Sequence, residues 1–476
     1  MFSFLGGVLV LILGFIFYSK FVEKQLDVDK NRQTPAYSVN DGVDFIPMAT
    51  WKAYLVQFLN IAGLGPVFGA LMGALYGPVA FLWVIFGCIL GGAVHDYVSG
   101  MISLEHRGIS LSEIYGIYLG KNVQRVMRFL TIFFSIIVGV VFVSGPAALL
   151  AQIVPGSFGI KFWIGIIFIY YFIATILPID VVIGNLYPVF GICLVVMALG
   201  VGGGIVCGGY NIPEIQLMNF HPKGVSMWPM MFVTIACGAI SGFHATQSPM
   251  IARCLKNEKH GRHVFYGAMI TEGIVGLIWV AAGLAFYNGV PGLESVLDKG
   301  GAAAAVFQIT RGLLGSVGGF LAILGVVVCP ITTGDTAFRG ARLMLADILN
   351  YTQKSIKNRL VLAVPMFVVG VFLTFVKFPI LWRYMGWLTQ AFAMMTLWAC
   401  SVYIYKKGKN YFIAIIPATF MTAVSVSYIL QAPEGFRLSA LFSNVVGIIV
   451  AVLFDLLFYK RVGKSNIKSC SLVNKI

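Results

Sequence analysis

The segment 239-AISGFHATQSP-249 constrains this chain more than any other, because it interrupts a long apolar run with glycine, proline and polar side chains. Lipid offers no hydrogen bonds, so irregular backbone at membrane depth persists only where protein or a water-filled cavity surrounds it. Membrane transporters use such broken helices to hold a solute near the middle of the bilayer. The segment therefore predicts a buried solute site built from Ser241, Gly242, His244, Thr246 and Gln247.

The composition places this segment in a membrane protein. Hydrophobic residues make up 59% of the 476 residues and charged residues only 11%, whereas soluble domains carry about 25% charged residues. We therefore expect an all-α polytopic membrane protein without a separate soluble domain. The net charge of +15 is interpreted as Lys and Arg gathered in loops beside the lipid bilayer, and no nucleic acid partner is expected.

Apolar runs of about 20 residues, the length that crosses a bilayer, predict thirteen transmembrane spans. The first run lacks a basic start and a small-residue cleavage site, so we interpret it as an uncleaved span. The predicted spans are 3–20, 52–76, 79–104, 127–152, 162–178, 185–207, 228–252, 264–287, 314–338, 360–376, 380–405, 411–430 and 437–459.

The loops between these spans alternate in charge. One set holds 26 of the 33 Lys and Arg residues; these basic loops are 20–52, 105–128, 253–263, 339–359, 406–409 and the tail from 460. The other set holds 7, namely Lys161, Lys223, Lys299, Arg311, Lys377, Arg383 and Arg437. Because positive charge accumulates on the cytoplasmic side, we predict an external N-terminus and a cytoplasmic C-terminus in the inner (plasma) membrane.

A second broken helix is predicted in span 52–76, which reads 57-QFLNIAGLGPVFGALMG-73 and is interrupted by Asn60, Gly63, Gly65 and Pro66. Span 228–252 is the fifth span after this one, an odd number, so the two cross in opposite directions. Paired interrupted helices point to inverted repeats with the solute site between them; the alternative is that the glycines only allow close helix packing. We predict an inverted five-helix repeat with two discontinuous helices. The expected divisions are 1–51, with the first span and a cytoplasmic loop; 52–207 and 228–405, the two repeats; and 406–476, with two further spans and a tail.

The segment 329-CPITTGDTAFRGARLMLAD-347 predicts a cation site. Hydroxyl groups of Thr332 and Thr333 lie beside a proline that frees a backbone carbonyl, and such oxygens suit a hard monovalent cation. Asp335 and Arg339 stand four residues apart, a spacing that pairs side chains on a helix. Asp335 either binds an ion or proton or pairs with Arg339 as a gate or latch; the alternative is an ordinary helix-end pair. Arg342 is interpreted as an ordinary cytoplasmic charge.

Ionisable residues within apolar spans are costly and usually functional. Glu272 is expected to take part in ion or proton coupling, and His244 to contact a carboxylate or to titrate. His95 and Asp96 are placed near the cytoplasmic end of span 79–104 as gate or latch residues. The eight cysteines form no CxxC pair and are interpreted as small apolar residues. The six histidines show no ligand spacing, so no metal site, disulfide or cofactor beyond a coupling proton or sodium ion is expected. No catalytic motif or Walker lysine is present, which argues against an enzyme or an ATP-driven pump.

A cytoplasmic helix is predicted outside the membrane. In 105-EHRGISLSEIYG-116, Ser110 and Glu113 have the spacing of a capping box. This pattern marks the first turn of a helix.

Four strings resemble the carbon starvation protein A family: 34-TPAYSVNDGVDFIP-47, 61-IAGLGPVFG-69, 235-IACGAISGFHA-245 and 332-TTGDTAFRGARLML-345. They run in order across most of the chain. The resemblance implies a bacterial or archaeal inner-membrane secondary transporter linked to peptide uptake during carbon starvation or to proton-coupled pyruvate uptake. It also implies a relation to the amino acid–polyamine–organocation superfamily, whose fold contains an inverted five-helix repeat. By that analogy Thr332 and Thr333 fall where related folds place a cation site. The chain departs from the family pattern at 246-TQSPMIARC-254, a proposed site element.

Together these patterns predict a cation-coupled secondary transporter that imports a peptide or a small carboxylate such as pyruvate. Its partners are expected to be that solute and the lipid bilayer. Two alternatives remain at this stage: a membrane sensor that signals through a partner protein, and a solute channel.

Overall fold

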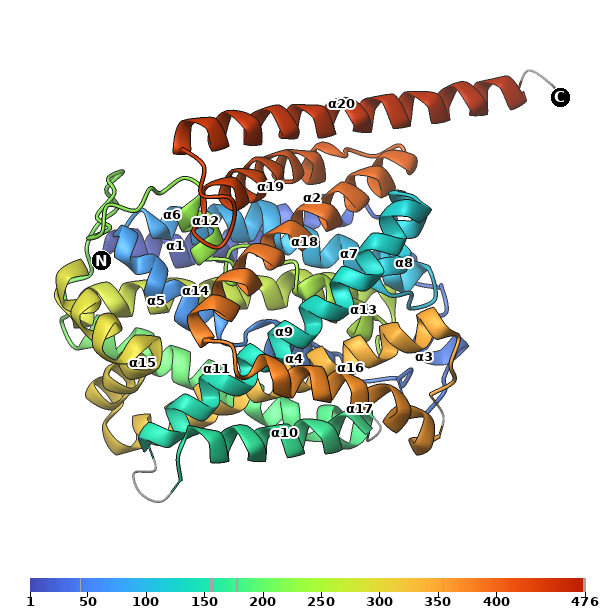
Figure 1. Cartoon of the computed structure of the whole chain (residues 1–476). Helices are drawn as coiled ribbons and strands as arrows, with labels where there is room; N and C mark the ends of the chain where they lie inside the picture. Colours follow the sequence, from blue (N-terminus) through green and yellow to red (C-terminus); the bar gives the residue numbers. More distant parts are fainter. Residues whose placement is uncertain (43, 154–157, 177–178, 354, 474–476) are drawn as a thin grey trace.

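The computed structural model describes residues 1–476 except 43, 154–157, 177–178, 354 and 474–476; side chains at 152–153, 179–187, 318–319, 321–324, 379 and 463–473 are also left undescribed. All regular elements in the described part are helices (Figure 1). The first eleven are α1 (Phe2–Leu13), α2 (Ser19–Glu23), α3 (Pro35–Ser38), α4 (Thr50–Ile61), α5 (Ala70–Gly73), α6 (Ala80–Phe86), α7 (Ala93–Glu105), α8 (Leu111–Tyr118), α9 (Lys121–Ile153), α10 (Ile160–Ile176) and α11 (Ile179–Cys207). The rest are α12 (Met230–Thr234), α13 (His244–Ala252), α14 (Gly267–Phe286), α15 (Val290–Ala322), α16 (Cys329–Leu349), α17 (Ile356–Leu373), α18 (Phe378–Lys406), α19 (Phe412–Gln431) and α20 (Ala440–Val473).

Short π- and 3₁₀-helical segments connect several of these helices. They are η1 (Gly14–Tyr18), η2 (Gly65–Gly69), η3 (Ala74–Tyr76), η4 (Gly87–Gly92), η5 (Glu258–His260), η6 (Arg262–Tyr266) and η7 (Ile323–Val328).

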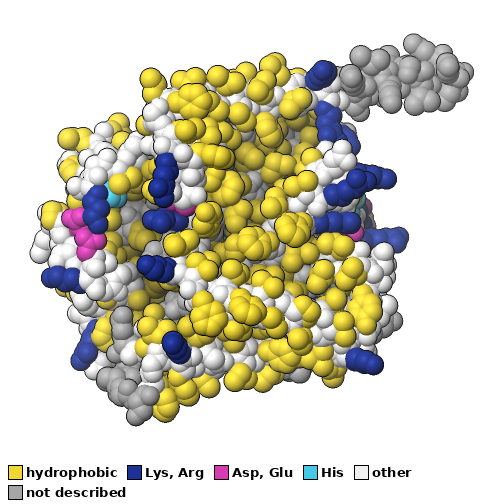
Figure 2. Space-filling model, in the orientation of Figure 1, with side chains coloured by type: hydrophobic (Ala, Val, Ile, Leu, Met, Phe, Trp, Pro, Cys, Tyr) yellow, Lys and Arg dark blue, Asp and Glu magenta, His cyan; other side chains and the backbone are white. Residues whose placement is uncertain are grey.

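Nine helices of the described chain are long and apolar enough to cross a membrane. Figure 2 shows a broad face of hydrophobic side chains, with Lys and Arg toward its margins. The prediction of an all-helical polytopic membrane protein is therefore confirmed. The nine segments are Phe2–Glu23, Ala80–Glu105, Lys121–Ala151, Pro188–Cys207, Glu258–Phe286, Ile356–Leu373, Ile380–Lys406, Phe412–Gln431 and Ala440–Val462.

The other four predicted spans are not among these nine segments. Span 52–76 is two helical pieces, Thr50–Ile61 and Gly65–Tyr76, bent by 53°. Span 228–252 consists of α12 and α13 with irregular backbone between them, and span 162–178 matches α10, a shorter apolar helix. The count of thirteen spans stays a prediction.

The fourth of these spans, 314–338, was predicted with the wrong boundaries. The backbone is non-helical at Gly315, and the helix that follows continues through α16 to Leu349. The expected loop 339–359 is therefore helical over its first part. Arg342, interpreted above as an ordinary cytoplasmic charge, is fully buried.

The helices sort into a buried centre and an outer layer. α4 contacts both α13 and α14, and α9 packs along α16. In contrast, α20 lies along one edge of the bundle and packs on α19 (Figure 1), and its Leu441, Leu456 and Leu457 are exposed. In a bilayer such exposed leucines face lipid. The outer helices therefore separate the polar residues of the centre from the lipid.

The expected capping box is present. Ser110 and Glu113 bond reciprocally at the start of α8, with the Ser110 amide donating to the Glu113 carboxylate at 2.8 Å. A local pattern thus predicted this helix start correctly.

Candidate functional site

The two helix breaks meet at the centre of the bundle. A Cβ added to Gly65, where η2 begins, would lie 2.2 Å from the Cys237 sulfur in the break between α12 and α13. Pro66 lies close to Gly238 of the same break. Only a residue without a side chain allows this approach, which explains the need for glycine at position 65.

Local sequence accounts for both breaks. In the first, Ala62 leaves the helical conformation and Pro66 lacks an amide hydrogen. In the second, Gly238 has φ of +87°, a left-handed conformation that glycine adopts without strain. The Gly242 amide then donates to the Thr389 carbonyl of α18 at 2.9 Å, which anchors the segment before α13.

A buried cluster of ionisable side chains surrounds the second break. His244 Nδ1, at the first residue of α13, lies 3.0 Å from Asp96 Oδ2 of α7. Asp96 Oδ1 lies 2.7 Å from His95 Nδ1. On the other side of the ring, His244 Nε2 lies 3.5 Å from Glu272 Oε2 of α14, and the Gly238 amide donates to Glu272 Oε1 at 3.1 Å. His95, Asp96, His244 and Glu272 are all fully buried, so this network is isolated from bulk solvent.

The cluster changes the setting of two predicted residues. His95 and Asp96 were expected near a cytoplasmic helix end, apart from the solute site. The structure instead places Asp96 directly against His244. The gate or latch role stays a prediction, but these residues belong to the same network as the broken helix.

The first break faces a different set of atoms, all of them neutral. The Thr333 hydroxyl lies 3.1 Å from the Leu59 carbonyl and 3.1 Å from the Cys329 carbonyl. The Thr332 hydroxyl lies 2.6 Å from the same Cys329 carbonyl, and the Cys329 sulfur lies 2.8 Å from the Ala62 carbonyl. The break of α4 and the start of α16 therefore gather carbonyl and hydroxyl oxygens, the donor type that hard cations prefer.

Several buried polar atoms beside the breaks have no hydrogen-bond partner among the described residues. This holds for both amide atoms of Asn60, the Ser241 hydroxyl, and the carbonyl oxygens of Gln57 and Gln247. Gln57 also connects the two broken helices, because its amide donates to Ser248 at 3.2 Å. Buried polar groups are nearly always paired, so a group of exceptions requires a functional explanation.

Other predicted site residues lie apart from the charged cluster. A Cβ on Gly63 would approach the Thr333 hydroxyl to 3.2 Å, so Gly63 borders the oxygen-rich set. Thr246 lines a pocket of about 20 Å³ together with residues of α8 and α16. Arg339 lies 4.0 Å from Asp44, a partner that was not foreseen, and donates to the Ala174 carbonyl. Asp335 is buried on the same helix.

The cavities distinguish the two ends of the bundle. A cavity of about 600 Å³ is lined by Phe68, just after the first break, and by Gly301, Trp382 and Arg383 at the end with few basic loop residues. The 20 Å³ pocket, with Ser110 and residues of α13 and α16, lies toward the basic loops. Of these two cavities beside the helix breaks, the larger one therefore lies at the end with few basic loop residues.

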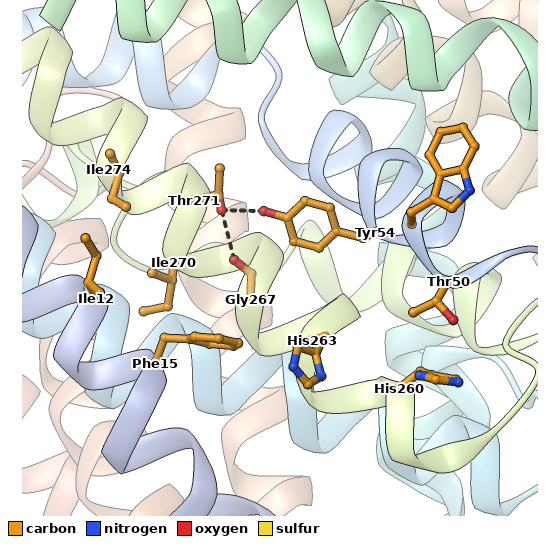
Figure 3. Close-up of a pocket in the computed structure, with 11 residues that line it drawn as sticks. Ile12, Phe15, Thr50, Tyr54, His260, His263, Gly267, Ile270, Thr271 and Ile274 are labelled. Atoms are coloured by element: carbon orange, nitrogen blue, oxygen red, sulfur yellow. Dashed lines mark hydrogen bonds between the residues drawn. The ribbon is translucent and has the colours of Figure 1, made fainter. Parts of the chain in front are cut away.

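A larger groove, of about 880 Å³, lies between α1, α4 and α14 (Figure 3). Tyr54 and Thr271 hydroxyls lie 2.5 Å apart in it, and Thr271 donates to the Gly267 carbonyl at 3.1 Å. Most of its lining is apolar, and none of the predicted site residues belongs to it. Its size therefore gives no reason to move the solute site there.

Two contacting discontinuous helices in an all-helical membrane bundle, with buried polar groups at their breaks, define an architecture typical of membrane transporters. Comparison with known proteins identifies the family. The model of the carbon starvation protein CstA family matches residues 1–166 and 151–307, and the chain belongs to this family. The predicted family resemblance is confirmed.

Three relatives indicate what the family contains. An uncharacterized membrane protein of Haemophilus influenzae is 41% identical over 64% of this chain and 96% of its own length. The peptide transporter CstA of Campylobacter jejuni is 30% identical over 57% of this chain and 48% of its own. The pyruvate/proton symporter BtsT of Escherichia coli is 26% identical over 58% and 48%. These relatives support a transporter that is embedded in the membrane and acts on a small solute.

The sequence reasoning missed three contributors to the site. Cys237 was interpreted as a small apolar residue, yet it lies beside His244 and Glu272. The Leu59 and Ala62 carbonyls belong to the backbone and have no sequence signal of their own. For Cys237 a signal existed, since it stands seven residues before His244 within the broken segment.

Proposed function

We propose that this protein is a secondary active transporter that imports a small organic solute, a short peptide or a carboxylate such as pyruvate, together with a cation. The observation that carries the proposal is the group of buried, unpartnered polar atoms beside two contacting helix breaks, including Asn60, Ser241 and Gln247. Each unpaired group costs about 1–3 kcal/mol. A bound polar solute would offset that cost.

The proposed solute site lies between the broken helices. Its residues are those predicted from sequence: Asn60, Gly63, Gly65, Pro66, Ser241, Gly242, His244, Thr246 and Gln247. The N-terminus of α13 adds backbone amides and the positive end of a helix dipole, which favour a carboxylate. Peptides and pyruvate both carry a carboxylate, in keeping with the names of the relatives.

We propose that the coupling cation binds at the first break. Thr332, Thr333 and the carbonyls of Leu59 and Cys329 supply oxygens from α4 and α16. A cation there would join one helix from each proposed repeat, so its binding would favour one arrangement of the two. Asp335 and Glu272 are further coupling candidates, because both carboxyl groups are buried.

The repeats proposed for 52–207 and 228–405 receive support from helix contacts. The first helices of the two segments contact each other, α4 with α13; so do the second, α7 with α14, the third, α9 with α16, and the fourth, α10 with α17. Equivalent elements near a two-fold axis meet in this way. Rocking of one repeat against the other would alternate access, with Arg339 and Asp44 as a latch near the basic loops and with Asp96 and His95 transmitting movement of α13.

The proposed orientation follows from charge. The basic loops, which hold 26 of the 33 Lys and Arg residues, would face the cytoplasm, with the protein in the inner membrane. The 600 Å³ cavity would then open to the outside, as an importer that waits for solute requires. The segments 1–51 and 406–476 would flank the repeats.

Uptake by purified protein in liposomes tests the proposal. Accumulation of pyruvate or a dipeptide above the external concentration, driven by an imposed proton or sodium gradient, is the expected result. Solute that only equilibrates would favour a channel, and binding without flux would favour a sensor. Either outcome would contradict secondary transport.

Binding can be measured separately by thermal shift with peptides and monocarboxylates. Asn60→Ala and Ser241→Ala should leave the solute-free protein as stable as before, because both remove polar atoms without protein partners, yet should reduce the stabilisation by the true solute. Ser401→Ala is the matched control, since the Ser401 hydroxyl bonds within its own helix to the Leu397 carbonyl at 2.8 Å. Equal solute responses in all three variants would remove Asn60 and Ser241 from the site.

A further inference from the structure

Three side chains with different donor atoms converge at the second helix break. The Cys237 sulfur, a ring nitrogen of His244 and a carboxylate oxygen of Glu272 all lie within 4.8 Å of one another. They come from the irregular segment, α13 and α14, so the fold rather than sequence proximity brings them together. We propose that these three residues form a binding site for a divalent transition metal ion, with Zn²⁺ as the occupant.

The contact between His244 Nδ1 and Asp96 leaves His244 Nε2 available to bind a metal. His244 Nδ1 faces Asp96 at 3.0 Å. Because an ionised carboxylate only accepts hydrogen bonds, this geometry favours the His244 tautomer whose proton is on Nδ1. Nε2 then presents its lone pair toward Glu272 Oε2 at 3.5 Å. A histidine that donates its second nitrogen to a carboxylate is the usual arrangement in zinc proteins, because the carboxylate fixes the ring and raises its basicity.

Glu272 is oriented in the same way. Its Oε1 accepts the Gly238 amide at 3.1 Å, while its Oε2 has no hydrogen-bond partner among the described residues. His244 Nε2 likewise has none there. Both atoms belong to fully buried side chains. Two pre-oriented, unpartnered donor atoms therefore point into the space beside the Cys237 sulfur.

The spacing fits a metal of zinc size. With bonds of about 2.0–2.3 Å, ligand atoms of a tetrahedral site stand about 3.3–3.7 Å apart. The distance of 3.5 Å between the nitrogen and the oxygen agrees with this. The upper limit of 4.8 Å for the other separations leaves only a small movement of the thiol to complete the site.

The donor set selects the class of ion. Thiolate and imidazole ligands favour Zn²⁺ and related transition ions, whereas Na⁺, Mg²⁺ and Ca²⁺ prefer oxygen. On binding, the Cys237 thiol releases its proton to solvent and its sulfur bonds to the metal. Cys237 is partly exposed, so an ion can enter from its side. Three protein ligands also leave a fourth position open, as in zinc sites that bind a further small ligand.

The test measures metal binding and needs no transport activity. Full-length protein, stripped with a chelator and desalted after addition of Zn²⁺, should retain one ion per chain by atomic absorption. Replacement by Co²⁺ should give the near-ultraviolet absorption of a cobalt–thiolate bond. Cys237→Ser should abolish this band. Cys254→Ser, a change of a buried cysteine whose sulfur faces the Asp44 and Met250 carbonyls, should keep it.

Two further variants separate a binding defect from misfolding. Glu272→Gln keeps the shape of the side chain and should weaken Zn²⁺ binding strongly. Asp96→Asn should weaken it about 10–100-fold, the usual effect of removing the partner of a ligating histidine. Elution as a single symmetric species by gel filtration shows that each variant is folded.

Two results would overturn the inference. Wild-type protein that retains no Zn²⁺ would show that the cluster holds protons only, and equal Zn²⁺ content in wild type and Cys237→Ser would place any ion elsewhere. Because the assay is independent of uptake, the metal site and the transport function can fail separately.

Discussion

The two broken helices use different chemistry at their breaks. The break of α4 faces neutral oxygens, from the Leu59 carbonyl and the Thr333 hydroxyl. The break between α12 and α13 faces charged groups, with His244 held between Asp96 and Glu272. Two helices with equivalent places in the proposed repeats therefore carry different groups, neutral oxygens at one break and titratable side chains at the other. The difference teaches that similar backbone geometry does not imply similar ligands.

The largest effect is expected from breaking the charged side. Asp96→Asn leaves His244 and Glu272 buried without their full partner set, and loss of one member of a buried charged pair costs about 3–5 kcal/mol. We expect a much lower melting temperature. We also expect uptake to fall more than about 100-fold, because a cost of about 3 kcal/mol at the site corresponds to two factors of ten at about 1.4 kcal/mol each. Thermal unfolding and liposome uptake measure the two effects. Wild-type values in both assays would show that the network has no role.

The contact between the two breaks is the second target. Gly65→Ala would place a Cβ 2.2 Å from the Cys237 sulfur, and overpacking of this kind costs about 1–3 kcal/mol. Uptake should fall about tenfold, because the breaks must separate to accommodate the methyl group. Gly165→Ala in α10 is the matched control, since nothing lies within 4 Å of its added Cβ. Similar uptake by both variants would contradict a required contact.

A moderate effect is expected on the neutral side. Thr333→Val keeps the shape of the side chain but removes the hydroxyl that meets the Leu59 and Cys329 carbonyls, which costs about 1 kcal/mol. The concentration of coupling cation needed for half-maximal uptake should rise about fivefold, and the free energy of unfolding should fall by about 1 kcal/mol. Thr310→Val, whose hydroxyl bonds within its own helix to the Val306 carbonyl, should behave as wild type. A response of both variants alike would remove Thr333 from the cation site.

The smallest effect is expected far from both breaks. Asp44→Asn weakens a pair whose charged atoms stand 4.0 Å apart, while Arg339 keeps its bond to the Ala174 carbonyl. Both side chains are buried, yet the long separation and the remaining bond of Arg339 limit the loss. We therefore expect a cost below about 1 kcal/mol and a change of uptake below about fivefold. Reaction of a cysteine introduced near the basic loops with a water-soluble thiol reagent should become faster. An unchanged reaction rate would argue against a latch.

Much of this comparison could be predicted from the sequence because it rests on local signals. Gly63, Gly65 and Pro66 disrupt a helix wherever they stand, and the capping box of α8 lies within four residues. The contact of Asp96 with His244 joins residues far apart in the chain. No periodicity reveals such a contact, which is why Asp96 was expected at a helix end.

Cys237 and Arg342 illustrate the other reason for failure. Both were interpreted from average behaviour: cysteine as a small apolar residue, and a basic residue after an apolar span as a loop charge. The structure places the first beside a histidine and a carboxylate and buries the second with a bond to Gln353. Averages fail where tertiary contacts supply partners.

The attachment of the second break to α18 through a backbone hydrogen bond has a consequence for engineering. Gly242 binds α18 through its amide and the Thr389 carbonyl, and a Cβ there would lie 2.2 Å from the Ala393 nitrogen. The side chains that follow, from Thr246 to Ser248, take no part in this attachment. A library that varies Thr246 and Gln247 while Gly242 and Ser248 stay fixed should therefore yield folded proteins with altered solute preference, so selectivity can be redesigned without rebuilding the scaffold.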